Sequence, residues 1–230
     1  MFSLLDLTFH STFLFLVGSS VITASEMFTP YHPSILPLKY VLSLETAVTV
    51  IAAFAYNHLI KIIGQPHHPN IIAFRYLDWY ATTPLLLLSF IIYLNYLTNK
   101  AAATKDPERP NLIKLDYGKI FIILVLNFLM LTFGYLGENK FMDHTLACII
   151  GFIPFITMIY LLWIWYRNEA NDMIFNIFTI VWGLYGIVYF LPTIWKNLSY
   201  NTLDIIAKVG FGFLVWYELI QRRLTNPKIQ

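Results

Sequence analysis

Charged residues are scarce in this chain of 230 residues. Only 12% of the positions are Asp, Glu, Lys or Arg, whereas 58% are hydrophobic and 17% are aromatic. A soluble domain has about 25% charged residues, so this chain carries too little charge for an ordinary water-soluble fold. The formal net charge is only +2, which gives no indication of nucleic acid as a partner.

Cysteine is nearly absent as well. The single cysteine, Cys148, excludes a disulfide framework and a cysteine metal cluster. We expect no metal site, and we expect this thiol to be inert on a lipid-facing helix. The N-terminal segment MFSLLDLTFH lacks the basic region and the small-residue cleavage site of a signal peptide. We therefore expect the first apolar run to remain as a membrane span.

Long apolar runs are what the chain has instead. Seven of them approach the roughly 20 residues that cross a bilayer, at residues 4–24, 38–62, 71–97, 119–137, 144–166, 173–194 and 199–221. The predicted fold is all-α and integral to the membrane: a seven-transmembrane helix bundle that forms a single domain over residues 1–230. The segment LPTIWKNLSYN is expected to be a short loop between the last two spans, without paired glutamates for proton release.

Basic residues at the ends of the spans and between them are unevenly divided between the two sides of the predicted bundle. One side has ten: Lys39, Lys100, Lys105, Arg109, Lys114, Lys119, Arg167, Arg222, Arg223 and Lys228. The other side has three: Lys61, Lys140 and Lys196. Because Lys and Arg gather in cytoplasmic loops, we expect the N-terminus to be extracellular and the C-terminus cytoplasmic, in a multi-pass protein of the cell membrane.

A few ionisable residues lie well inside the predicted spans, namely Glu45, Arg75, Asp78, Asp204 and Lys208. An unpaired charge at the bilayer centre costs at least ~2.5–3.5 kcal/mol, so such residues need a reason. Asp204 and Lys208 are four residues apart and share one helix face, as do Asp78 and Thr82. One interpretation is an ion-pair network that holds the helices in register. The other is Schiff-base chemistry, since a desolvated lysine readily provides a neutral amine.

Two motifs connect these residues to a known family. RYLDWYATTPLLLL, residues 75–88, and LDIIAKVGFG, residues 203–212, resemble the corresponding motifs of bacteriorhodopsin, and the chain resembles the microbial (type 1) rhodopsins over most of its length. The resemblance implies all-trans retinal covalently bound to Lys208 as a protonated Schiff base. It also implies that Asp78 is the primary counterion and proton acceptor, that Asp204 is the second counterion, and that Arg75 lies on their extracellular side.

The same resemblance implies a retinal pocket, for which ordinary helix packing is the alternative. Its residues would be Trp79, Thr83, Leu86, Asn127, Met130, Gly134, Trp182, Tyr185 and Tyr189. Gly186 stands where the family commonly has proline, and Tyr189 where bacteriorhodopsin has tryptophan. Leu86, at the colour-tuning position, favours absorption of green over blue light.

The family's functional triplet here reads Asp78, Thr82, Ser89, a DTS motif in which Thr82 is a hydrogen-bonding neighbour of Asp78. Serine cannot supply a proton near neutral pH, whereas bacteriorhodopsin has a proton-donating aspartate at that position. Glu45 is expected at the level of Ser89 and is a candidate donor. This combination resembles the rhodopsins of giant viruses. Alternatively, Glu45 is a hydrated interfacial glutamate or part of a cation pathway.

The resemblance implies a light-driven outward proton pump rather than an enzyme of hydrolytic or redox chemistry. A light-gated cation channel of the viral type and a sensory photoreceptor with a separate transducer are the alternatives, although the short tail TNPKIQ gives no indication of an output domain. Helix 38–62 has one glutamate followed by AVTVIAAFAY, which favours the pump. The expected partners are the lipid bilayer (a host membrane if the chain is viral), retinal and protons, and a homo-oligomer is expected because relatives form trimers or pentamers.

Overall fold

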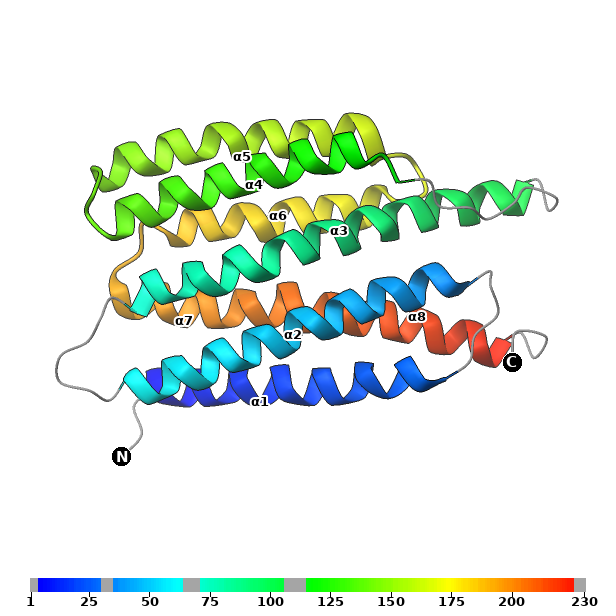
Figure 1. Cartoon of the computed structure of the whole chain (residues 1–230), viewed down its shortest axis with the longest axis horizontal. Helices are drawn as coiled ribbons and strands as arrows, with labels where there is room; N and C mark the ends of the chain where they lie inside the picture. Colours follow the sequence, from blue (N-terminus) through cyan, green and yellow to red (C-terminus); the bar gives the residue numbers. More distant parts are fainter. Residues whose placement is uncertain (1–3, 30–34, 64–70, 106–114, 226–230) are drawn as a thin grey trace.

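The computed structural model describes residues 4–29, 35–63, 71–105 and 115–225 (Figure 1). Three of the basic residues counted above, Arg109, Lys114 and Lys228, lie outside this range. The first five long helices are α1 (Leu4–Ser25), α2 (Leu36–Ile62), α3 (Ile71–Lys105), α4 (Tyr117–Glu138) and α5 (His144–Tyr166). A short 3-10 helix η1 (Glu26–Phe28) follows α1. No strand occurs among the described residues.

The rest of the chain forms two further helical rods. Helix α6 (Asp172–Val188) is the sixth rod. The seventh rod consists of α7 (Thr193–Asp204), the π-helical segment η3 (Ile205–Gly210) and α8 (Phe211–Thr225), which continue one another without a break. The rods therefore number seven over the described residues, as predicted. Five helices, α1 to α5, are long and apolar enough to span a membrane by themselves, and α6 is a shorter apolar helix.

Three of the predicted boundaries are wrong. Helix α3 continues to Lys105 rather than ending near residue 97, because the alanines that follow Lys100 are strong helix formers although they are not lipid-like. Helix α6 ends at Val188, six residues early, and α7 begins at Thr193 with Pro192 as its N-cap. Proline lacks the N–H that a continuing helix needs. Most of the predicted loop 191–201 is therefore helical.

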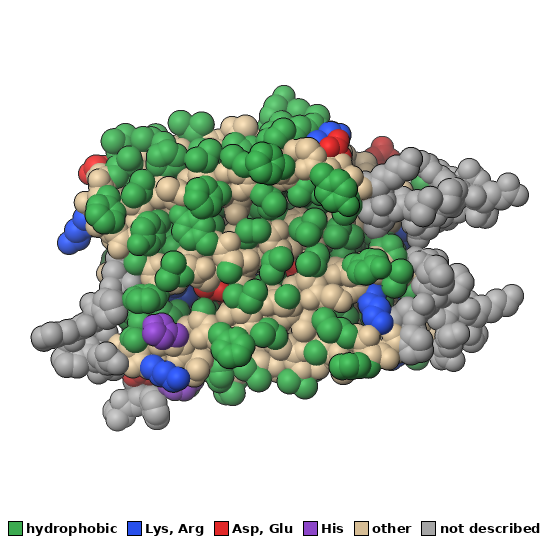
Figure 2. Space-filling model, in the orientation of Figure 1, with side chains coloured by type: hydrophobic (Ala, Val, Ile, Leu, Met, Phe, Trp, Pro, Cys, Tyr) green, Lys and Arg blue, Asp and Glu red, His purple; other side chains and the backbone are tan. Residues whose placement is uncertain are grey.

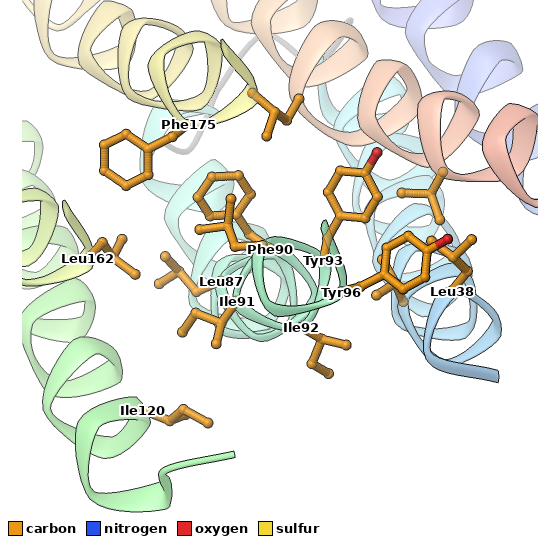
Figure 3. Close-up of a cluster of buried hydrophobic side chains, with 14 of the residues drawn as sticks. Leu38, Leu87, Phe90, Ile91, Ile92, Tyr93, Tyr96, Ile120, Leu162 and Phe175 are labelled. Carbon is orange, nitrogen blue, oxygen red and sulfur yellow. The ribbon is translucent and has the colours of Figure 1, made fainter. Parts of the chain in front are cut away.

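The rods lie side by side with alternating direction, and the most extensive contacts are between α4 and α5, α2 and α3, and α1 and α2 (Figure 1). We name the end of the bundle where α1 begins the N-terminal end, and the end where α8 finishes the C-terminal end. Figure 3 shows the apolar core of the C-terminal half, in which α3 contributes Leu87, Phe90 and Ile91 to a cluster shared with α2 and α6.

The outer surface of the bundle is apolar. Large hydrophobic side chains such as Phe54, Phe121 and Ile153 are 62–73% exposed, and apolar side chains cover most of the face in Figure 2. An exposed apolar surface of this extent is typical of contact with a membrane. Hydrophobic residues therefore form both the core and the outer surface, while a few charged residues, such as Arg75 and Lys208, are buried inside.

Candidate functional site

The seventh rod changes its helical geometry where the buried lysine lies. Residues Ile205–Gly210 form a π-helical turn, and Lys208 lies within it at 1% exposure. Wider π turns are rare and occur frequently at functional sites. No feature of the sequence predicted this turn, although the spacing of Asp204 and Lys208 did predict that they share one face.

Two carboxylates face the Lys208 amine. Its Nζ lies 2.5 Å from Oδ2 of Asp78 on α3 and 3.6 Å from Oδ2 of Asp204. Neither carboxylate is more than 5% exposed. Including Arg75, which is also buried, the cluster holds two cations and two carboxylates, so it can be buried without net charge.

The two carboxylates differ in their hydrogen bonds. Asp204 accepts hydrogen bonds from the hydroxyls of Tyr56 and Tyr185, both at 2.8 Å, and from the Trp79 indole at 3.4 Å. Apart from the amine, Asp78 has no such donor among the described residues, and its Oδ1 has no hydrogen-bond partner there. Donors to a carboxylate favour its ionised form, and Asp204 accepts more such hydrogen bonds than Asp78 does.

Arg75 closes the cluster towards the N-terminal end. Its guanidinium donates to Tyr56 at 2.8 Å and to Asn197 at 3.1 Å, donates to Asn201, and lies 3.7 Å from Asp204. The two asparagines come from α7, in the segment predicted to be a loop. Sequence reasoning missed them because their signal, polar residues four apart on one helix face, is visible only once α7 is known to start at Thr193.

Thr82 does not contact the Asp78 carboxylate directly. Its hydroxyl donates to the main-chain carbonyl of Asp78 at 2.9 Å, as hydroxyls in helices commonly do. The predicted neighbour is therefore present, but its bond is to the backbone of Asp78. Thr82 is fully buried, one turn from the carboxylate in the direction of Ser89.

An apolar cavity extends from Lys208 across the bundle. Eight residues of the predicted pocket line it beside the lysine: Trp79, Thr83, Leu86, Met130, Gly134, Trp182, Tyr185 and Tyr189. Asn127 does not line it. The amide of Asn127 instead donates to the Thr83 hydroxyl at 2.8 Å, so it holds a lining residue from behind.

Helix α5 contributes a wall that the sequence analysis did not identify. Cys148, Gly151, Phe152 and Phe155 line the cavity, whereas Cys148 was expected on a lipid face. That expectation is wrong, because Cys148 is only 8% exposed and faces the bundle. Helix α5 is apolar all round, so its hydrophobic pattern could not indicate which face is buried.

Gly134 and Gly186 allow aromatic rings to approach the helix backbone at the cavity. A Cβ at Gly134 would overlap the Tyr76 hydroxyl, and one at Gly186 would overlap the ring of Phe152. Gly186 departs from the proline that the family resemblance leads one to expect. The Phe152 ring occupies the space that a side chain at position 186 would fill, so the cavity wall has no gap at Gly186.

A further buried acid lies nearer the C-terminal end. Glu45 is fully buried on α2, and Ser89 on α3 donates a hydrogen bond to its Oε1. The other oxygen, Oε2, has no partner among the described residues. The Glu45 side chain has no exposed surface, which favours a position inside the bundle over the interfacial position that the sequence left as an alternative.

Comparison with known proteins assigns the chain to a family. Residues 9–222 match the model of the bacteriorhodopsin-like proteins. The chain is a microbial rhodopsin. It is 29% identical to the green-light absorbing proteorhodopsin of the gamma-proteobacterium EBAC31A08 over 236 residues, which cover 92% of this chain and 87% of the relative.

Solved structures show the same relationship. The viral rhodopsin OLPVRII is 29% identical with a TM-score of 0.80, covering 95% of this chain and 99% of that one. A blue light-absorbing proteorhodopsin from Med12 shares the fold, with a TM-score of 0.74 at 22% identity, covering 97% of this chain and all of the other. The microbial rhodopsin is therefore a seven-helix, multi-pass integral membrane protein.

The cavity suits retinal, which members of this family bind through a lysine. Its lining is aromatic and aliphatic apart from a few polar groups, and Lys208 reaches it together with Asp204. An amine at the end of an apolar cavity is the arrangement that a long apolar aldehyde requires. The unpartnered oxygen of Asp78 beside this amine can accept a hydrogen bond or a proton.

Proposed function

We propose that this microbial rhodopsin is a light-driven outward proton pump, with all-trans retinal bound to Lys208 as a protonated Schiff base. The observation that carries the proposal is the 2.5 Å contact between the Lys208 Nζ and the Asp78 Oδ2. Bound retinal supplies a light-driven isomerisation that moves the Lys208 nitrogen and changes its proton affinity. The side chains of the protein accept this proton and return one to the nitrogen.

Asp78 accepts the proton from the Lys208 nitrogen. It is better suited than Asp204 because the negative charge of Asp204 is stabilised by three hydrogen-bond donors and by Arg75. Once Asp78 is neutral, Arg75 has only Asp204 as a nearby anion within the cluster. We expect the proton to be lost towards the N-terminal end, which the uneven distribution of Lys and Arg predicts to be extracellular.

Glu45 returns the proton from the other side. It is buried at the level of Ser89 and reaches α3 through that hydroxyl. A buried carboxyl group without a cationic partner is more stable in its protonated form, which is the form a donor needs. Glu45 is the only ionisable side chain that the described residues place beside Ser89.

An apolar layer separates the two polar regions and favours a pump over a channel. Between Glu45 and the Asp204 cluster, α2 turns Ala52 and Ala53 towards the interior, where they pack with Leu16 of α1 and Val209 of η3. These four side chains offer an ion no polar group in place of its lost hydration. The hydroxyls buried one turn away, of Thr12 on α1 and Thr49 on α2, each donate to a backbone carbonyl. A channel needs a continuous polar lining, whereas single protons can be passed by movement of one nitrogen.

Light-dependent pH changes test the proposal. We expect unbuffered cells that contain the retinal-loaded protein to acidify their medium in light, and a protonophore to abolish the change. Under voltage clamp the photocurrent should keep one sign over the accessible range of membrane potential. A photocurrent that reverses with potential would establish the channel alternative. A visible band without any photocurrent or pH change would instead favour the sensory alternative.

A further inference from the structure

A second charged cluster lies at the N-terminal end of the bundle, against the cavity wall and apart from Lys208. Glu138 at the end of α4 accepts a hydrogen bond from Lys196 of α7 at 2.7 Å and lies 3.5 Å from the Nε2 of His144, at the start of α5. The side chains of Glu138 and Lys196 are each only 7% exposed, whereas that of His144 is 39% exposed. The cluster thus joins a buried ion pair to a histidine that water can reach.

Tyr189 connects this cluster to the cavity. Its ring stacks on the His144 imidazole with centroids 4.0 Å apart and planes 11° apart, and the Lys196 amine lies 5.2 Å from the ring centroid. Tyr189 is 4% exposed and lines the cavity. A charge on His144 is therefore separated from the cavity by the thickness of one ring.

We propose that His144 is a wavelength-determining residue of this rhodopsin, whose protonation from the outer medium places a positive charge behind Tyr189 and shifts the absorption band to shorter wavelength. The inference rests on the proposed binding of retinal in the cavity. It assigns a role to Glu138 and Lys196 as well, as the ion pair that holds this site.

The charge balance of the cluster gives His144 control over its net charge. Glu138 and Lys196 cancel each other, so the cluster is neutral with a neutral imidazole and carries one positive charge with an imidazolium. Around it, Asp143 is the N-cap of α5 and its carboxylate accepts a hydrogen bond from the Leu146 N–H, and Lys140 lies in the preceding turn. Histidine is the side chain that most readily changes charge between pH 5 and 8.

The position across the bundle from Lys208 sets the sign of the shift. Helix α5 packs against α4, α6 and α3, whereas η3 packs against α1, α2 and α6, and Figure 1 shows α5 apart from the rod that contains η3. Light absorption by a conjugated iminium moves positive charge away from its nitrogen and towards its far end. A cation at that far end opposes the movement and raises the excitation energy. Protonation of Asp78 has the opposite effect, because it removes an anion that stabilises charge at the nitrogen.

The experiment is an absorption titration of the purified, retinal-loaded protein between pH 8 and pH 5. Acidification of the wild type should give a blue-shifting component from His144, which is opposite in sign to the red shift that protonation of Asp78 would cause. His144→Phe keeps a ring against Tyr189 but cannot be protonated, and it should lose the blue-shifting component alone. His58→Phe is the matched control, since His58 also packs on an aromatic ring, Phe74, but that ring does not line the cavity as Tyr189 does.

Glu138→Gln provides a second, independent test. Loss of the anion beside the imidazole destabilises its charged form, so the blue-shifting component should remain and move to lower pH. The imidazole signals in NMR spectra of the same samples should titrate with the same midpoint. A blue-shifting component that persists in His144→Phe, or a shift to longer wavelength from His144, overturns the inference. If no visible band forms with retinal, the proposed function fails and this inference fails with it.

Discussion

Ser89 on α3 donates a hydrogen bond to Glu45 on α2, in the buried C-terminal half of the bundle. The two residues belong to different helices, and each provides what the other lacks. Ser89 occupies the position on α3 where bacteriorhodopsin has its proton-donating aspartate, but serine has no acidic proton. Glu45 has the carboxyl group but lies on the neighbouring helix α2. The acid is thus displaced sideways by one helix and remains at the same depth.

This pairing predicts that Glu45→Gln slows return of the proton to the Lys208 nitrogen. Glutamine keeps the shape and the hydrogen bond with Ser89 but carries no transferable proton. The state in which the Lys208 nitrogen is deprotonated should therefore decay more slowly, and its decay rate should depend on the pH of the medium. Flash photolysis with detection in the near-ultraviolet and visible range measures this decay.

The double variant Glu45→Gln/Ser89→Asp is the matched rescue. It places a carboxyl group on the opposite member of the hydrogen-bonded pair, at the same level. Faster decay in the double variant than in Glu45→Gln is expected if depth matters more than the helix of origin. Unchanged, pH-independent decay in Glu45→Gln would exclude Glu45 as the donor.

Because Asp78 and Asp204 have different surroundings beside Lys208, we expect light-driven acidification to depend on a carboxylate at position 78. Asp78→Asn removes the acceptor with a free oxygen, so light-driven acidification should be lost and the visible band should shift to longer wavelength. Asp78→Glu keeps an acceptor and should retain part of the activity. Acidification by Asp78→Asn at the wild-type rate would show that Asp204 or another group accepts the proton.

The positions of these ionisable groups could be predicted because each is expensive in an apolar span. A lysine and an aspartate four residues apart, with a second aspartate in RYLDW, left few arrangements that bury them without net charge. The seven spans followed from apolar length in the same way. What length could not give was the early end of α6 or the continuation of α3, since polar but helix-forming residues do not reveal where a helix stops.

Neutral polar residues and apolar walls were harder to predict. Asn197 and Asn201 hold Arg75 from a segment that read as a loop, because asparagine and lysine there lower the hydropathy. The α5 wall was missed for the opposite reason. A helix that is hydrophobic on every side shows no preferred face, and only packing shows that Cys148 faces inward while Ile149 faces outward at 59% exposure.

Two glycines on α6 predict a contrast in stability. Gly186→Ala forces a methyl group into the space of the Phe152 ring, whereas a Cβ at Gly183 meets no atom within 4 Å. Overpacking of this kind costs about 1–3 kcal/mol, while alanine improves helix propensity over glycine by about 1 kcal/mol. Gly186→Ala should therefore bleach faster at elevated temperature than the wild type, and Gly183→Ala should not.

The control for that contrast is Phe152→Leu, which removes the ring that Gly186 accommodates. In this background the penalty of Gly186→Ala should fall, as expected for residues in direct contact. The rate of loss of the visible band at a fixed temperature is compared for four proteins: the wild type, Gly186→Ala, Phe152→Leu and the double variant Phe152→Leu/Gly186→Ala. Equal bleaching of the Gly186 and Gly183 variants would contradict the close packing of Phe152 against α6.

The single thiol of the chain, Cys148, reports directly on occupancy of the cavity. Because it lines the cavity and is 8% exposed, bound retinal should shield it from a small neutral maleimide. Labelling should be several-fold slower in the retinal-loaded protein than in the protein without retinal, as measured by intact-mass spectrometry. Cys148→Ser/Ile149→Cys moves the thiol by one residue to the outward face of α5, where retinal should not change the labelling rate. Equal protection at both positions would mean that retinal acts by tightening the whole bundle, and equal labelling of Cys148 with and without retinal would place retinal elsewhere.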